Sequence, residues 1–169
     1  MDSGPEEASI VSRMGDLTLR IAVPAMILAC MAFCGCGVTL EEIQKTENVA
    51  QLKRWTGAEK GWVREYSAWR LGALAEPTAT GDLVRLLEDE YPWVRLRAAD
   101  ALGQTKDRSA IEPMIRALER ERDIDVRCAL IRALGRMPGS ASEEAISRNL
   151  HSRHLLVKGA ARNALRRQQ

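Results

Sequence analysis

A repeat of about thirty residues runs through most of this 169-residue chain, and it constrains the fold more than any other feature. Its copies are anchored by valines spaced 31, 32 and 31 residues apart, namely Val63, Val94, Val126 and Val157. Eight residues after each valine comes a leucine, at Leu71, Leu102, Leu134 and Leu165. Such self-similarity is typical of proteins that stack one structural unit many times. We therefore expect a linear array of units, each contacting mainly its neighbours.

Each copy has the pattern of two amphipathic helices joined by a turn. The apolar positions of the first half recur at helical spacing, and the second half keeps apolar columns of its own. The second-half columns are Leu83, Met114 and Ile146, and Leu87, Leu118 and Leu150. In three copies a glycine follows the leucine, and we expect it to end the first helix in a left-handed conformation. These glycines are Gly72, Gly103 and Gly135.

The pattern is clearest in residues 89–135, DEYPWVRLRAADALGQTKDRSAIEPMIRALERERDIDVRCALIRALG. This stretch resembles HEAT-like repeats of the kind found in phycobilisome lyases, and the resemblance covers residues 58–169. It implies an all-α fold, a short right-handed α-solenoid of three to four helical hairpins. The units are expected near 58–88, 89–121 and 122–152, with a partial unit at 153–169. Because such repeats serve scaffolds, enzyme subunits and chromophore lyases alike, the resemblance specifies fold and leaves function open.

Residues 36–57 are expected to form a tether and an N-terminal capping helix. Thr39 and Glu42 have the spacing of a capping box that opens the helical stretch LEEIQKTENVAQLKRW. Leu52 lies as far before its valine as the second-helix leucine Leu83 does in the next unit. This helix is therefore expected to take a second-helix position and to cover the exposed end of the stack.

Residues 1–35 are expected to be a signal or anchor segment. Between Arg20 and Glu41 lie twenty residues without a formal charge, as in a secretory signal. The sequence FCGCG within this stretch resembles the end of a bacterial lipoprotein signal, which implies lipid attachment at Cys36. Cys30 is a second candidate for the modified residue. The alternative is an uncleaved transmembrane helix, since about 20 apolar residues suffice to span a bilayer.

The lipoprotein resemblance implies a place in the cell envelope, as an outer-membrane or periplasm-facing lipoprotein. Gly37 follows the cysteine where inner-membrane lipoproteins carry a retention aspartate. Met14 is an alternative start of the chain. If Cys36 carries lipid, Cys128 is the remaining thiol after cleavage, so we expect no internal disulfide and an inert, packed Cys128.

Two sets of basic residues recur at fixed positions of the repeat. The cationic column follows the valines directly and consists of Arg64, Arg95, Arg127 and Lys158. We expect structural ion pairs between this column and Glu59, Glu90 and Asp123. The arginine row lies on the second helices, two residues after a core position, and consists of Arg85, Arg116 and Arg148. The resemblance puts this row on the concave side, where it is either solvated charge or a partner-binding surface.

The few aromatic residues gather near the start of the repeats. Trp62, Tyr66 and Trp69 follow one side of a helix, and Trp55 lies close by in sequence. They are expected to pack between the N-terminal helix and the first hairpin, or to form an exposed patch for a partner.

Catalytic and metal-binding motifs are not found in this sequence, so no cofactor is expected. A HEAT-like iron hydroxylase carries His-Glu pairs, whereas His151 precedes Ser152 and His154 precedes Leu155. No glycine-rich phosphate loop and no CxxC pair at zinc spacing are present.

The leading hypothesis is a non-catalytic HEAT-repeat adaptor, tethered to the envelope, that binds another protein. The first alternative is a lyase-type accessory enzyme that handles a chromophore. The second is binding of anionic lipid or nucleic acid through the C-terminal end, which has no acidic residue after Glu144. Under the leading hypothesis we expect neither nucleic acid nor a small-molecule substrate.

Overall fold

The computed structural model describes residues 38–168, in which all regular secondary structure is helical and no strand occurs. Residues from Leu40 onward form one compact unit. The longer helices are α2 (Leu40–Lys45), α3 (Val49–Trp55), α4 (Gly61–Ala73), α5 (Thr80–Leu86), α6 (Pro92–Thr105), α7 (Ile111–Arg120), α8 (Ile124–Leu134), α9 (Ser140–Arg148) and α10 (Leu155–Arg166). Short 3-10 turns span Pro77–Ala79, Arg108–Ala110 and Asn149–His151.

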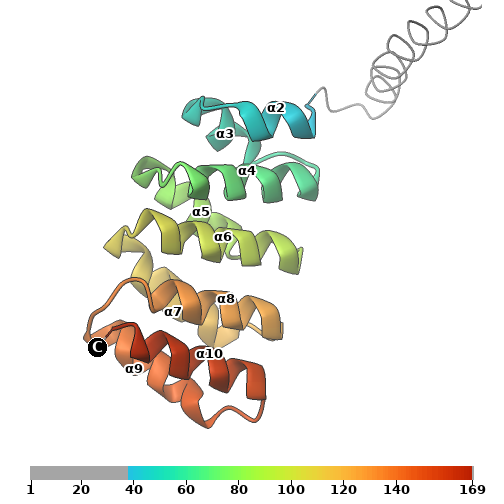
Figure 1. Cartoon of the computed structure of the whole chain (residues 1–169). Coiled ribbons are helices and arrows are strands. Elements are labelled where there is room, and N and C mark those ends of the chain that lie inside the picture. Colours follow the sequence, from blue (N-terminus) through green and yellow to red (C-terminus); the bar gives the residue numbers. More distant parts are fainter. Residues whose placement is uncertain (1–37, 169) are drawn as a thin grey trace, which may run out of the picture. The chain divides into compact units, whose positions relative to one another are not determined.

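The helices form the expected stack of hairpins (Figure 1). First helices α4, α6, α8 and α10 lie side by side in one layer, and second helices α5, α7 and α9 lie behind them (Figure 1). Each first helix packs against the first helix of the next unit, and each second helix packs against the following first helix. The all-α solenoid of helical hairpins predicted from the repeat is therefore confirmed.

The columns identified in the sequence form the core of this stack. All four anchoring valines are buried, and Leu71, Leu102 and Leu134 are inaccessible to solvent. The second-helix residues Leu83, Met114 and Ile146 are inaccessible too. Full burial of one such side chain contributes about 1.5–3 kcal/mol, so the repeated columns supply much of the stability. Leu165 on the last described helix is half-buried.

The left-handed conformation predicted for the three repeat glycines is wrong, and of the three only Gly135 stands at a helix end, as the C-cap of α8. Gly72 and Gly103 lie inside α4 and α6, and Gly135 has a right-handed φ of −63°. A methyl group added at Gly103 would lie 2.9 Å from Cα and Cβ of Ala133 on the next first helix. Gly72 meets Ala101 and Gly135 meets Ala164 in the same way. These glycines are needed because neighbouring first helices approach closely, which leaves no room for a Cβ atom.

Left-handed residues do follow two of the first helices, α4 and α6, at other positions. Ala75 has a φ of 49° and Lys106 a φ of 55°. Lys106 is the C-cap of α6, and its backbone N–H donates to the carbonyl of Leu102. Helices α4 and α6 therefore end one and two residues after their glycines, at Ala73 and Thr105, and the left-handed residue follows as a non-glycine.

The N-terminal capping helix is also different from the prediction, because it is broken into α2 and α3. The Asn48 side chain accepts the backbone N–H of Gln51 as the N-cap of α3, and Thr46 Oγ1 accepts the N–H of Asn48. These local bonds stop α2 and start a second helix. Both helices pack against α4, with Ile43 and Leu52 inaccessible to solvent. They form a short extra hairpin that covers α4.

Candidate functional site

The first two members of the cationic column each form a buried, two-point ion pair. Arg64 Nε lies 2.6 Å from Asp89 Oδ2, and its Nη2 lies 3.0 Å from Asp89 Oδ1. Arg64 Nη1 donates to the carbonyls of Ala58 and Glu59, each at 2.8 Å. Hydrogen bonding and the charge of Asp89 raise the pKa of Arg64 despite burial. The guanidinium thus joins the loop before α4 to the loop after α5.

Arg95 repeats this arrangement one unit later. Its Nε lies 2.7 Å from Glu121 Oε2, and its Nη2 lies 3.0 Å from Glu121 Oε1. Its Nη1 donates to the carbonyl of Asp89 at 2.8 Å. Burial alone would raise the pKa of Glu121, but the hydrogen bonds and charge of Arg95 and the N–H groups of Asp123 and Arg122 outweigh burial, so this pKa is lowered.

Structural pairing is thus observed for Arg64 and Arg95 of the cationic column, but their main acidic partners are not the predicted residues. Asp89 and Glu121 pair with the arginines, while Glu90 adds one contact to Arg64 at 3.3 Å. Glu59 contributes its backbone carbonyl, and Asp123 caps α8 instead. The partner follows the second helix of the same unit because the arginine reaches across the hairpin.

The third member, Arg127, has no such acidic partner. Its Nη2 donates to Asn149 Oδ1 at 2.8 Å, and its Nε is buried without an acceptor. Asn149 is buried, and its amide nitrogen donates to the carbonyl of Ala145. Arg127 forms no ion pair among residues 38–168, unlike Arg64 and Arg95.

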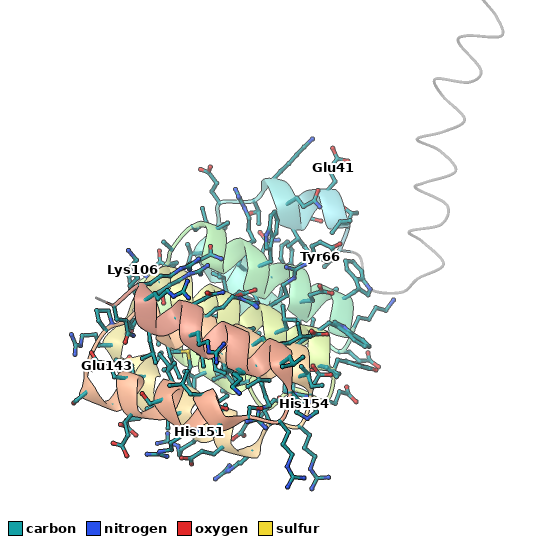
Figure 2. The ribbon with its side chains drawn as sticks, turned by 60° about the horizontal axis from the view of Figure 1, so that its bottom comes forward. Glu41, Tyr66, Lys106, Glu143, His151 and His154 are labelled. Atoms are coloured by element: carbon teal, nitrogen blue, oxygen red, sulfur yellow. The ribbon has the colours of Figure 1, made fainter. Side chains whose placement is uncertain are left out.

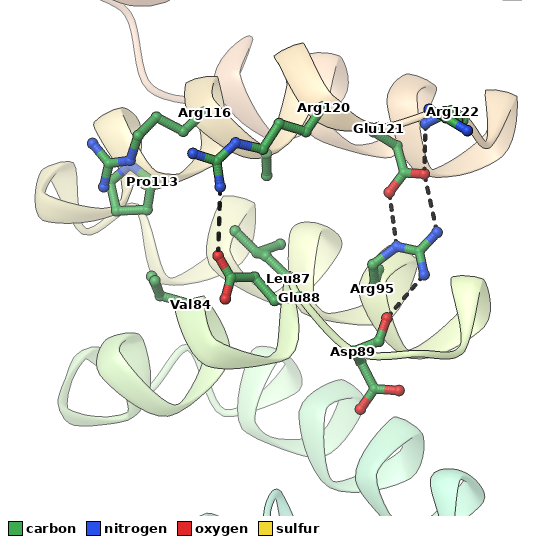
Figure 3. A pocket seen from close by; sticks show the side chains of 11 residues that line it. Val84, Leu87, Glu88, Asp89, Arg95, Pro113, Arg116, Arg120, Glu121 and Arg122 are labelled. Atoms are coloured by element: carbon green, nitrogen blue, oxygen red, sulfur yellow. Dashed lines mark hydrogen bonds and ion pairs between the residues drawn. The ribbon is translucent and has the colours of Figure 1, made fainter.

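A groove of about 580 Å³ lies between α5 and α7 (Figure 3). Apolar side chains of Val84, Leu87, Pro113 and Ala117 line part of it. Its charged lining consists of Glu88, Asp89, Glu121, Arg95, Arg116, Arg120 and Arg122. Asp89 and Glu121 are already neutralised by the cationic column, so the groove has an excess of positive charge.

Exposed arginines surround this groove. Arg120 lies 4.0 Å from Glu88, and both side chains are largely exposed. Arg116 and Arg122 are exposed and form no side-chain hydrogen bond or ion pair within the part of the chain that the structure describes. Figure 3 shows Arg116 beside Pro113 at one end of the groove and Arg122 beside Glu121 at the other. The repeat could not identify Arg120 or Arg122, because neither position holds an arginine in every unit.

The arginine row lies on the second helices, as expected, but its members differ in their surroundings. Arg85 is exposed and pairs with Asp82 on the same helix. Arg148 pairs with Glu144 on α9 and, at 3.0 Å, with Glu119 on α7. Only Arg116 of the three lacks a charged partner within residues 38–168. The row is therefore not one continuous basic stripe, and Arg116 is its member best placed for a partner.

The aromatic residues form two small clusters on the first helices. Tyr66 and Trp69 on α4 meet edge to face with ring centroids 6.5 Å apart. Trp69 is 38% exposed, and Trp62 and Tyr66 are half-buried. Trp93, which is 49% exposed, stacks on Tyr91 at 4.6 Å. The second cluster was not expected from the sequence, although Trp93 aligns with Trp62 in the repeat.

The basic C-terminal end lies on α10 and the connection that precedes it. Arg153, Arg162 and Arg166 are exposed there, as are Leu155 and Leu156. Figure 2 marks His151 and His154 on the same connection between α9 and α10. In the inner units, the positions that correspond to Arg162 hold Ala68, Ala99 and Ile131, which are fully buried. A charged residue there makes the outer face of α10 polar.

Cys128 is a buried free thiol, and burial raises its pKa, which disfavours the reactive thiolate. No group of three or more His, Cys, Asp or Glu side chains within residues 38–168 is arranged to hold a metal ion. None of the helices described there has the length and apolar character required to cross a bilayer. The predictions for the signal segment, for Cys36 and for Cys30 lie outside the described residues.

Two solved structures resemble this stack. Human deoxyhypusine hydroxylase in complex with glycerol superposes with a TM-score of 0.65 and 20% identity, over 73% of this chain and 44% of that chain. The complex of CpcE and CpcF of phycocyanin lyase from Nostoc sp. superposes with a TM-score of 0.53 and 23% identity, over 73% of this chain and 66% of that chain. At these identities the likeness concerns the fold alone. No curated protein matches the chain.

The chain spans less than two thirds of the length of either solved structure. Within the sequence, the family model of HEAT repeats matches residues 82–166, which is half of the chain and contains most of the stacked hairpins. The buried valine and leucine columns and the close glycine–alanine contacts recur through this same region. The chain therefore belongs to the family of HEAT repeat proteins.

Proposed function

We propose that this chain is a non-catalytic adaptor that binds an acidic segment of another protein in the groove between α5 and α7. The main observation in support is that Arg116 and Arg122 are exposed at the groove without a counter-charge among the described residues. Arginine is enriched at protein interfaces, and it recognises carboxylates through two parallel hydrogen bonds. The apolar floor around Leu87 supplies area that a partner can cover.

The composition of the groove supports binding rather than catalysis. Its lining contains no Ser, Thr, Cys, His, Lys or Tyr side chain that could serve as a nucleophile. Its carboxylates Asp89 and Glu121 are held by Arg64 and Arg95 and are not available to transfer protons. The remaining carboxylate, Glu88, is exposed beside Arg120.

A soluble peptide of Glu-Ser-Leu repeats tests this proposal, with a Gln-Ser-Leu peptide as its neutral counterpart. Fluorescence anisotropy of the labelled peptides with the full chain measures affinity at low and moderate salt. The acidic peptide is expected to bind and to weaken as salt rises, because exposed charge pairs are screened. The triple variant Arg116→Glu, Arg120→Glu and Arg122→Glu is expected to lose this binding.

The matched control changes three exposed arginines at the other end of the stack, Arg153→Glu, Arg162→Glu and Arg166→Glu. It alters the net charge equally and is expected to keep most of the binding. If the control loses binding and the groove variant keeps it, the basic C-terminal end is the binding surface and the proposal is wrong. A coloured covalent product on co-expression with a bilin would contradict the non-catalytic role.

We also propose that the adaptor is tethered to the cell envelope through lipid on Cys36. The uncharged stretch and the FCGCG sequence support this proposal. Replacing Cys36 with Ala is expected to leave a larger, unprocessed species in membrane fractions, whereas Cys30→Ala is processed normally. Intact mass spectrometry decides, since an N-terminus that still contains Ile21 through Cys36 would favour a transmembrane anchor.

A further inference from the structure

The loops after the second helices occupy equivalent places in the three units, and their key residues are Asp89, Glu121 and Ser152. Each lies five residues before its anchoring valine. Each also accepts the backbone N–H two residues further on: Asp89 from Tyr91 at 3.0 Å, Glu121 from Asp123 at 2.9 Å, and Ser152 from His154 at 3.3 Å. The loop is therefore built alike three times, but the third copy lacks the carboxylate.

The missing carboxylate leaves Arg127 incompletely bonded. In the first two units, both carboxylate oxygens bond the Nε and Nη2 edge of the arginine. In the third unit, Asn149 supplies one oxygen to Nη2, and Nε is buried without an acceptor. A neutral amide also leaves the positive charge of a half-buried guanidinium uncompensated.

A cavity of about 200 Å³ adjoins this arginine. It is lined by Ile115, Leu118, Glu119, Arg127, Ala145, Arg148 and Asn149. Its volume far exceeds the ~30 Å³ that one water molecule occupies, so a carboxylate group has room there. Two arginines and one glutamate give the lining a positive balance. Helix α7 lines both this cavity and the groove that it shares with α5.

We propose that the cavity at Arg127 binds an aspartate or glutamate side chain of the partner protein, which supplies the carboxylate missing from the third unit. This inference rests on the proposed adaptor function and specifies the chemistry of its partner. Nε itself is closed off from the cavity in this structure, so the carboxylate acts on the charge of the Arg127 guanidinium that lines the cavity. A water molecule would leave that charge uncompensated, whereas a carboxylate neutralises it. The cavity thus recognises one acidic side chain, and the groove on the other side of α7 adds further charge contacts.

The variant Ser152→Asp tests the proposal because it restores the internal carboxylate at the position of Asp89 and Glu121. Ser152→Asn is the matched neutral control. Arginine Nε–H signals of the full chain are followed by NMR, with the Arg127 signal assigned from Arg127→Lys. Sodium acetate is titrated against sodium chloride at constant ionic strength, so that only the carboxylate changes.

In the wild type and in Ser152→Asn, the Arg127 Nε–H signal is expected to shift saturably with acetate. In Ser152→Asp the Arg127 Nε–H signal is expected to lie near the signals of Arg64 and Arg95 and not to shift when acetate is added. A wild type that does not respond to acetate, or a Ser152→Asp variant that responds equally, would overturn the proposal. This result is independent of the groove variants, so its failure would leave the adaptor proposal standing.

The Glu-Ser-Leu peptide separates a protein-borne carboxylate from a free one. Its affinity is expected to fall roughly tenfold or more in Ser152→Asp, because one charge-assisted pair is lost, and to stay unchanged in Ser152→Asn. If acetate binds at Arg127 but the peptide affinity is equal in both variants, the cavity takes a free carboxylate and the proposed partner contact is wrong.

Discussion

The first two full units of the stack and the third full unit use the same arginine position in different ways. In the units of Arg64 and Arg95, the guanidinium is closed by an internal carboxylate and tied to backbone carbonyls. In the unit of Arg127, the internal carboxylate is replaced by Asn149, and a buried donor is left over. Arg64 and Arg95 therefore hold their hairpins together, whereas Arg127 is the arginine proposed to contact a partner.

The two regions stack alike despite this difference. Gly103 meets Ala133 and Gly135 meets Ala164 at nearly equal distances, so the close approach of first helices continues to α10. Since the spacing persists where the ion pair is lost, small residues and buried apolar columns set the geometry of the stack. The charged loops are then free to vary from unit to unit.

The largest contrast between the regions is expected in the leucine column. Leu102→Asp puts an unpaired charge at a position inaccessible to solvent and is expected to cost about 5 kcal/mol or more. Leu165→Asp changes a half-buried residue of α10 and is expected to cost far less, because water can reach the carboxylate. Circular dichroism and thermal melting measure both, and equal melting temperatures would show that the column is assigned wrongly.

Removing the arginine itself is the next contrast. Arg95→Leu leaves the buried carboxylate of Glu121 without its cation and is expected to cost about 3–5 kcal/mol. Arg127→Leu removes a donor that already lacks an acceptor and is expected to cost about 1 kcal/mol. Urea unfolding of the two variants gives the difference. A loss at Arg127 as large as that at Arg95 would mean that Arg127 is structural.

Glycine substitutions probe the stacking that both regions share. Gly103→Ala forces a methyl group against Ala133 and is expected to cost about 1–3 kcal/mol by overpacking. Gly159→Ala on α10 meets nothing within 4 Å and is expected to add up to about 1 kcal/mol through helix propensity. Opposite changes in melting temperature are the expected outcome. A stabilising Gly103→Ala would contradict the role of close helix approach.

Much of this fold could be predicted because repeated apolar columns identify the buried faces without knowledge of any contact. The reason for the glycines could not, because a helix end and a close helix contact both favour glycine in sequence. The break in the N-terminal helix at Asn48 could not be predicted either. Its cap depends on a local hydrogen bond to Gln51, whereas the surrounding residues have good helical periodicity.

The candidate site was predictable only in part. The arginine row placed Arg116 correctly on a second helix, but the ion pairs of Arg148 with Glu119 depend on contacts between units. The change at Ser152 was visible in the sequence, five residues before Val157, where Asp89 precedes Val94 and Glu121 precedes Val126. Its significance emerges only when Arg127 Nε is seen to be buried without an acceptor.

Acid sensitivity gives the smallest expected difference between the regions. The pKa of Glu121 is lowered in the folded protein, so folding favours its charged form. Its contribution is therefore complete above its ordinary pKa of 4.5 and is lost as pH falls from there through the lowered value. Per carboxylate, the slope of unfolding free energy with pH is at most about 1.4 kcal/mol per pH unit.

Glu121→Gln is expected to flatten this slope below about pH 4.5, because the titrating group is gone. Ser152→Asp gives the third unit a carboxylate beside Arg127 and is expected to steepen it, since the new group should also be favoured in its charged form. Urea unfolding at several values between pH 3 and pH 6 measures the slopes. A slope that Ser152→Asp leaves unchanged would mean that its carboxylate does not pair with Arg127. The third unit would then differ from the first two units in its loop geometry, as well as in the missing acid.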